Sequence, residues 1–327
     1  MFSYRSLLKQ ALSITWKHKY LWVCGLFATL VASSGSWEYK ILTENLSQNF
    51  SSGSYYYKLG GFLTIGELVK KFFSGFINIF NYDAISVLNA LTLTLISLIV
   101  LTVFVWLAIV CQSTLVSSVK KITGSKKKIT ALNLRSEMTG ENRHFWPVLS
   151  LNILIKVMIS VAFFIVSLPL LFLIVKDSAL SAVIYTILFV IFLPIATGLA
   201  LMLKYAIAYT VLENYSFVKS IKKGWRLFIK NWLVSLEMAI ILFLIGLVAS
   251  GAVLLVLFLA LTPLLLLGLI FSATWLIIIT MIVAIIIIVL IGSILTTFQI
   301  ATWTSLFLRL KEKGAAAKLE RLFGRRQ

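Results

Sequence analysis

The sequence has 327 residues, of which 60% are hydrophobic and only 13% are charged, and its mean hydropathy is +1.01. Soluble domains carry about 25% charged residues, so this composition excludes a water-soluble protein. The 30 Lys and Arg residues outnumber the 11 Asp and Glu residues and give a formal net charge of +19. We therefore expect a basic integral membrane protein.

Long uncharged runs predict the membrane spans. A helix needs about 20 apolar residues to cross roughly 30 Å of hydrocarbon, and uncharged runs predict spans at about residues 20–37, 84–118, 147–175 and 179–204. The last run, residues 238–308, is too long for one span. Its expected break is Thr262-Pro263, because the residue before a proline is pushed out of the helical region, and Ser250-Gly251 is the alternative. The last two spans are then expected at 232–261 and 264–308.

Charge placement predicts the orientation. Positively charged residues flank the cytoplasmic ends of spans. With six spans and both the N-terminus and the C-terminus cytoplasmic, most Lys and Arg residues fall on one side, including those of a basic tail at 311–327. Seven spans would move that tail to the other side. The expected fold is an all-α six-span helical bundle, a single polytopic domain over 1–310 in the cytoplasmic membrane, with interfacial amphipathic helices on both faces.

Two segments between the spans are predicted to be amphipathic helices. The extracytoplasmic loop at 38–83 contains a capping-box pattern, Thr64 to Glu67, followed by apolar residues at helical spacing, which predicts a helix at 65–80. On the cytoplasmic side, residues 216–232 place five basic residues beside an apolar stripe, with Ser216 as the N-cap. The stripe consists of Phe217, Ile221, Trp225, Phe228 and Trp232.

A weak threefold repeat is also visible. Trp22, Trp146 and Trp232 each open or precede a span, and a hydroxyl residue lies sixteen positions before each of them, at Ser6, Thr130 and Ser216. The repeated unit would be an interfacial helix followed by two spans. The alternative is chance together with the aromatic belt common to membrane proteins.

Residues at about 200–245 carry a family resemblance. They are Lys204-Tyr205-Ala206-Ile207-Ala208-Tyr209, Leu212-Glu213-Asn214, Ser220, Gly224-Trp225 and Lys230-Asn231-Trp232. This segment resembles the six-span membrane domain attached to some bacterial glycerophosphoryl diester phosphodiesterases, and related stand-alone bacterial membrane proteins. In the fused enzymes a separate soluble barrel performs catalysis, and this chain has no room for it. The resemblance therefore implies a membrane module without phosphodiesterase activity.

Enzymatic chemistry is not indicated. The acids lie almost entirely in loops or at span ends, His18 and His144 lie at the expected membrane boundary, and Cys24 and Cys111 fall in apolar runs. These positions support neither a catalytic pair nor a metal site, so no catalytic residue, metal or cofactor is predicted.

Two charged residues are expected inside the membrane. Lys156 lies ten residues past Trp146 and Glu237 lies five past Trp232. A Lys156–Glu237 pair, joined by Asn152, would fix the register of two helices. The alternatives are a Lys156 side chain that snorkels to the interface and a substrate or proton site.

The basic cytoplasmic face is the strongest functional indication. Anionic lipids attract juxtamembrane Lys and Arg, so the expected partners are anionic phospholipids or an unknown membrane protein, and not nucleic acid. We therefore predict a non-enzymatic, phospholipid-associating accessory module. The alternatives are basic residues that only orient the chain, and a transporter or permease for a hydrophobic or lipid-like substrate that uses Lys156 and Glu237. The candidate lipid-binding residues are Lys219, Lys222, Lys223, Arg226 and Lys230.

Overall fold

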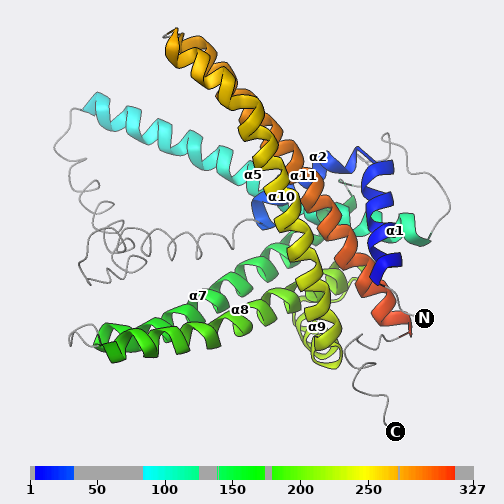
Figure 1. Ribbon diagram of the computed structural model, residues 1–327. Coiled ribbons are helices and arrows are strands. Elements are labelled where there is room, and N and C mark those ends of the chain that lie inside the picture. The colour runs from blue at the N-terminus through cyan, green and yellow to red at the C-terminus, as the bar shows by residue number, and fades with distance from the viewer. Residues whose placement is uncertain are drawn as a thin grey trace. The chain divides into compact units, whose positions relative to one another are not determined.

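The computed structural model describes residues 4–32, 84–124, 138, 140–173, 179–271 and 273–313, and all regular structure within these ranges is helical. Two helices of 14 and 12 residues come first, α1 (Tyr4–Lys17) and α2 (Leu21–Ala32). The others are α5 (Ala84–Gly124), the 3₁₀ turn η3 (Asn142–His144), α7 (Phe145–Leu173), α8 (Ala179–Glu213), α9 (Phe217–Lys230), α10 (Trp232–Ile270) and α11 (Thr274–Lys313) (Figure 1).

Five helices in the described part of the chain are long and apolar enough to cross a membrane. They lie at Leu91–Gly124, Asn142–Ala162, Val190–Glu213, Trp232–Gly268 and Thr274–Glu312. They correspond to the second through sixth expected spans. The first expected span, 20–37, is described only as α2, and the predicted helix at 65–80 and most of the basic tail lie outside the described residues.

The turn in the longest apolar run lies further along the chain than expected. Helix α10 continues through Pro263 to Ile270, and α11 begins at Thr274. A proline is tolerated inside a membrane helix where neighbouring groups satisfy the carbonyl that it leaves free. At the turn, the Ala273 N–H donates to the Gly268 carbonyl at 2.8 Å, and the position of a Cβ on Gly268 lies 2.7 Å from Ile277 Cγ1. The close approach at Gly268 allows the two helices to pack side by side as a hairpin (Figure 1).

The chain divides into two compact units. Unit 1 contains Met1–Val31, Leu107–Ile153 and Ala200–Gln327, and unit 2 contains Ala32–Trp106 and Leu154–Leu199. In unit 2, many described apolar side chains are exposed, such as Leu93 (68%) and Leu98 (63%) of α5. Exposed leucines at this density belong in hydrocarbon, as expected for helix segments that span a membrane.

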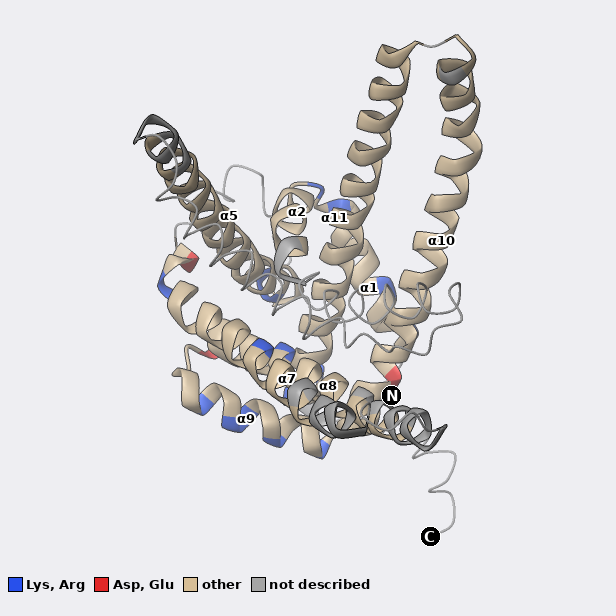
Figure 2. Cartoon of the chain, turned by 90° about the vertical axis from the view of Figure 1, so that its left-hand side faces the viewer, with Lys and Arg blue, Asp and Glu red and all other residues tan. Residues whose placement is uncertain are grey.

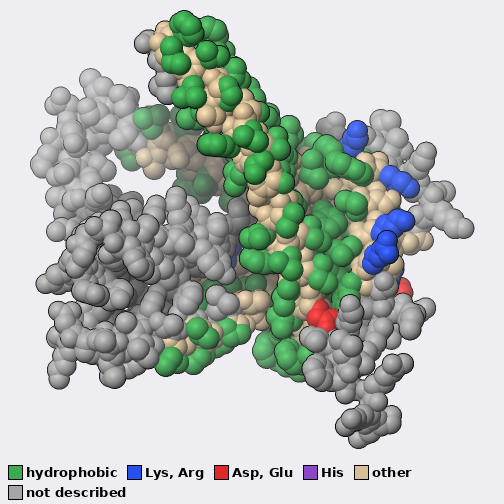
Figure 3. Space-filling view, in the orientation of Figure 1, with side chains coloured by type: hydrophobic (Ala, Val, Ile, Leu, Met, Phe, Trp, Pro, Cys, Tyr) green, Lys and Arg blue, Asp and Glu red, His purple; other side chains and the backbone are tan. Residues whose placement is uncertain are grey.

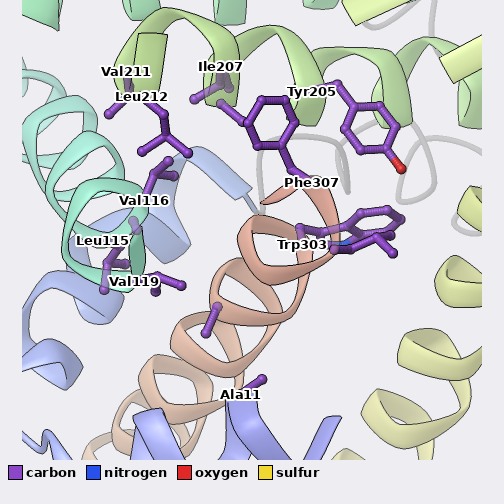
Figure 4. Packing of buried hydrophobic residues seen from close by; sticks show 14 of the residues in the cluster. Ala11, Leu115, Val116, Val119, Tyr205, Ile207, Val211, Leu212, Trp303 and Phe307 are labelled. Atoms are coloured by element: carbon purple, nitrogen blue, oxygen red, sulfur yellow. The ribbon is translucent and has the colours of Figure 1, made fainter. Parts of the chain in front are cut away.

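The core of unit 1 is a cluster of buried side chains from α1, α2, α5, α7, α8, α10 and α11. It includes Leu115, Tyr205 and Phe307, each at most 1% exposed (Figure 4). Helices α8 and α11 run in the same direction here, because successive turns of each meet: Tyr205 lies 6.2 Å from Trp303, and Tyr209 lies 4.8 Å from Phe307, between ring centroids. The C-terminal ends of α8 and α11 therefore coincide.

Small and hydroxyl-bearing residues allow the helices of unit 1 to approach closely. The position of a Cβ on Gly25 of α2 lies 2.1 Å from Thr297 Oγ1 of α11, and Thr29 Oγ1 donates to Thr296 Oγ1 at 2.9 Å. Helix contacts in membranes favour such residues, since lipid provides no hydrophobic drive for helix association. Gly246 and Gly251 of α10 do not play this role: a Cβ on Gly251 would meet nothing within 4 Å, and one on Gly246 only Gln299 Nε2 at 3.8 Å.

Candidate functional site

Helix α9 has the predicted N-terminus and the predicted basic face. Ser216 is its N-cap residue, with extended backbone, although its side chain makes no capping hydrogen bond. At about 100° per residue, the five basic residues fall on one side of the helix, called here the basic sector (Figure 2). All five are exposed: Lys219, Lys222, Lys223, Arg226 and Lys230.

The opposite side of α9 packs against α8. Thr210 Oγ1 of α8 donates to Ser220 Oγ at 2.8 Å, and one turn further Gly224 lies against Ala206, where a Cβ would stand 3.0 Å from the Ala206 nitrogen. Ser220 and Gly224 are both fully or nearly fully buried. Helix α9 therefore folds back along the last turns of α8, and small residues make the contact.

A third side of α9 is apolar and yet exposed. Val218, Trp225 and Ile229, called here the apolar sector, are 57%, 46% and 53% exposed. They lie between the buried side and the basic sector. Three residues of the predicted apolar stripe, Phe217, Ile221 and Phe228, pack against the core of unit 1, whereas Trp225 faces outward. The exposed surface of α9 thus has an apolar sector directly beside a basic one.

Helix α1 repeats this arrangement. Both helices have 14 residues, and when they are aligned by their ends the buried Leu7 and Ala11 fall on Ser220 and Gly224. The exposed Leu12 and Trp16 fall on Trp225 and Ile229 of the apolar sector, and Lys9 and Lys17 fall on Lys222 and Lys230.

The ends of the two helices also correspond. The His18 N–H donates to the Ile14 carbonyl and the Asn231 N–H to the Leu227 carbonyl, both at 3.1 Å. The first helices of two expected units are therefore similar, in a register that differs by three residues from the one expected from Ser6 and Ser216. Most of the expected third copy lies outside the described residues.

A buried polar network holds the corner between α8 and α9. His144 Nδ1 lies 2.9 Å from Glu141 Oε2, and His144 Nε2 lies 2.7 Å from Asn214 Oδ1. His144 and Glu141 are 6% and 8% exposed. Asn214 has φ of 54°, in the left-handed region that non-glycine residues rarely adopt. The network thus stabilises a strained corner that fixes where α9 begins.

The predicted intramembrane residues have separate surroundings. The Glu237 carboxylate accepts a hydrogen bond from the Tyr4 hydroxyl, which ties α10 to α1. Asn152 is buried in unit 1, where its Nδ2 donates to Gln112 Oε1 at 3.1 Å and to the Val148 carbonyl at 2.9 Å. Lys156 lies one turn further along α7, in unit 2. The Lys156–Glu237 pair stays a prediction, while Asn152 has a partner on α5 that the sequence did not indicate.

The two cysteines lie together in unit 1. Cys24 of α2 and Cys111 of α5 are both buried, and their thiols are within hydrogen-bonding contact. Among the residues that the structure describes, no three His, Cys, Asp or Glu side chains gather in a group that could hold a metal ion.

Comparison of the chain with known protein families, with curated proteins and with solved structures gives no match.

Proposed function

We propose that this protein is a non-enzymatic membrane module that associates with anionic phospholipids through α9. The observation that supports it is the exposed apolar sector directly beside the exposed basic sector. The apolar Trp225 side chain favours an environment out of water, whereas the Lys222 and Arg226 side chains favour contact with anionic groups. A helix with both surfaces exposed is typical of one that lies in the membrane interface.

The magnitudes favour a lipid partner. Each Lys or Arg near an anionic leaflet contributes about 1 kcal/mol, so the five basic residues of α9 contribute on the order of 5 kcal/mol by the same rule. Trp225 adds to this, because indole rings favour the level of the lipid headgroups. Helix α1 would strengthen the association through Leu12, Trp16 and its own basic residues.

The proposed orientation places both helices on the cytoplasmic side. The ends of several spans meet at the α8–α9 corner: Lys120 Nζ near the end of α5 donates to the Leu212 carbonyl at 2.8 Å, and Lys311 near the end of α11 pairs with Glu213. Helix α7 starts at the same corner, through His144. Six crossings with both termini on one side would make span starts and span ends alternate at that face. We assign this face to the cytoplasm because Lys and Arg residues are enriched at cytoplasmic ends of spans.

The resemblance to the phosphodiesterase membrane domain agrees with an accessory role. Its quoted residues include Gly224 and Asn214, which position α9 against α8. We propose kinship with that domain on this ground, together with a location in the bacterial cytoplasmic membrane.

Native mass spectrometry of the detergent-purified protein tests the proposal. The wild type should retain anionic phospholipid, and Lys222→Ala/Lys223→Ala/Arg226→Ala should lose it. A charge-matched control, Lys318→Ala/Arg321→Ala/Arg325→Ala, removes three positive charges from the C-terminal tail and should retain the lipid. Equal retention by the wild type and the α9 variant would mean that the basic sector only orients the chain.

A further inference from the structure

The α8–α9 corner brings two lysines and two tyrosines to the end of α11. Helices α8 and α11 run parallel, and one turn after the Tyr209–Phe307 contact Lys311 Nζ donates to Glu213 Oε1 at 2.6 Å. The Lys311 side chain is 44% exposed, and that of Glu213 is 21% exposed. This ion pair therefore lies at the surface, directly beyond the buried aromatic contact.

Helix α9 delivers the second lysine to the same place. Lys223 Nζ donates to the Tyr215 hydroxyl at 2.7 Å and lies 3.9 Å from the centroid of that ring. The Tyr215 and Tyr209 rings are 6.0 Å apart between centroids. Glu213 lies one turn past Tyr209 on α8, so the Lys311–Glu213 pair and the Lys223–Tyr215 pair both adjoin Tyr209.

The cluster offers more hydrogen-bond donors than the described residues use. An ammonium group has three donors, and the contacts above occupy one donor on each lysine. The Tyr215 hydroxyl accepts from Lys223 and keeps its own proton to donate. Two cations and one carboxylate leave a net positive charge, and this combination of ammonium and hydroxyl donors suits an oxyanion.

We propose that Lys223, Lys311, Tyr209 and Tyr215 form a binding site for one phosphate group. In the absence of ligand the Glu213 carboxylate pairs with Lys311, and the bound phosphate displaces that carboxylate. The phosphate belongs to a phospholipid headgroup or to a soluble phosphate, and the lipid source rests on the proposed function above. Unlike the basic sector, this site selects a single group by contacts from α8, α9 and α11.

The alternative is a corner whose ion pair only fixes the helix ends, and two substitutions separate it from a phosphate site. Lys311→Ala removes a donor to the phosphate, and we expect it to weaken binding by about tenfold, the loss for one charge-assisted hydrogen bond. Glu213→Gln removes the competing carboxylate, and we expect tighter binding. A purely structural pair predicts weaker folding in both variants and no opposite change in binding.

The experiment measures binding of two probes to the full chain. Native mass spectrometry reports retention of phosphatidic acid and phosphatidylglycerol from mixed detergent micelles, and thermal unfolding with added inorganic phosphate reports the soluble probe. The variants are Lys311→Ala, Glu213→Gln and Tyr215→Phe. Lys318→Ala is the matched control, because it removes one lysine from the C-terminal tail and leaves α9 intact.

Weaker binding in Lys311→Ala and tighter binding in Glu213→Gln, with Lys318→Ala unchanged, would support the site. If lipid retention depends on the α9 triple variant but not on Lys311 or Glu213, the site is overturned and the proposed function stands. If inorganic phosphate stabilises the wild type through Lys311 while no lipid is retained, the site takes a soluble phosphate and the proposed function fails. Binding of neither probe would overturn both.

Discussion

Gly224 of α9 lies against the backbone of Ala206 in α8, and this contact decides which side of α9 faces outward. A Cβ at Gly224 would stand 3.0 Å from the Ala206 nitrogen and 3.2 Å from its Cα. Backbone atoms cannot yield as a flexible side chain can. A larger residue at position 224 would therefore push α9 away from α8 and disturb its exposed apolar and basic sectors.

Gly224→Val should destabilise the protein by about 1–3 kcal/mol, the usual cost of overpacking, and should reduce lipid retention. Thermal unfolding of the purified protein measures the first effect. Gly251→Val is the matched control, because a Cβ there meets nothing within 4 Å. A Gly224→Val protein as stable as the Gly251→Val protein would show that α9 does not pack on α8 in this way.

Asn214 combines a strained backbone with a hydrogen bond, and two variants separate these contributions. Asn214→Gly relieves the left-handed φ of 54° but loses the bond to His144, whereas Asn214→Ala loses the bond and keeps the strain. We expect Asn214→Ala to be less stable than Asn214→Gly by about 1 kcal/mol. Both should be less stable than the wild type, because the buried His144 would lose a partner. Thermal unfolding ranks the three proteins.

The pairing of Tyr4 with Glu237 predicts an energetic coupling between α1 and α10. A double-mutant cycle with Tyr4→Phe and Glu237→Gln should give a coupling of about 1–3 kcal/mol, since the acceptor is a carboxylate. A second cycle with Lys156→Met and Glu237→Gln tests the predicted intramembrane pair in the same assay. Zero coupling in the first cycle would contradict the Tyr4 contact, and strong coupling in the second would establish the Lys156 pair.

Lys156→Ala and Glu237→Ala also address the transport alternative. Loss of protein abundance in the membrane would indicate a structural role for these residues. Normal abundance with loss of transport activity would favour the transport alternative.

Some of these features could be predicted from sequence, and the reasons for the others are physical. Helix α9 could be predicted because Ser216, the apolar spacing and the basic residues all indicate a helix there. The apolar spacing also identified Phe217, Ile221 and Phe228, which pack against the core. It could not show that Trp225 faces outward, since in a membrane an exposed tryptophan is as acceptable as a buried one. The turn lies after Ile270 and not at Thr262-Pro263, because the backbone preference before a proline does not break a helix that packs against α11. Nothing in the sequence pattern indicated the His144 network, whose partner Asn214 is 70 positions away.

The two cysteines provide a direct test of how α2 meets α5. Because the thiols of Cys24 and Cys111 are in contact, a membrane-permeant oxidant should join them in a disulfide. Mass spectrometry of the intact protein, after alkylation in denaturant, should then detect two free thiols before oxidation and none after it. The control, Cys111→Ser/Gly251→Cys, also has two cysteines, with the second on the open side of α10, and should keep both thiols. Two free thiols in the oxidised wild type would contradict the contact.

His18 gives the pH dependence of the turn between α1 and α2. Burial, and then the charge of Lys17, lower the pKa of His18 below its ordinary value of 6.5. The native state therefore binds this proton more weakly than the unfolded state, and stability falls as the pH drops below about 6.5 toward the native pKa. His18→Asn introduces the residue found at the matching position 231 and removes the titration. The melting temperature of the wild type should therefore fall more between pH 7.5 and pH 5 than that of His18→Asn. Parallel pH profiles for the two proteins would mean that His18 has the same pKa in the folded and unfolded chain.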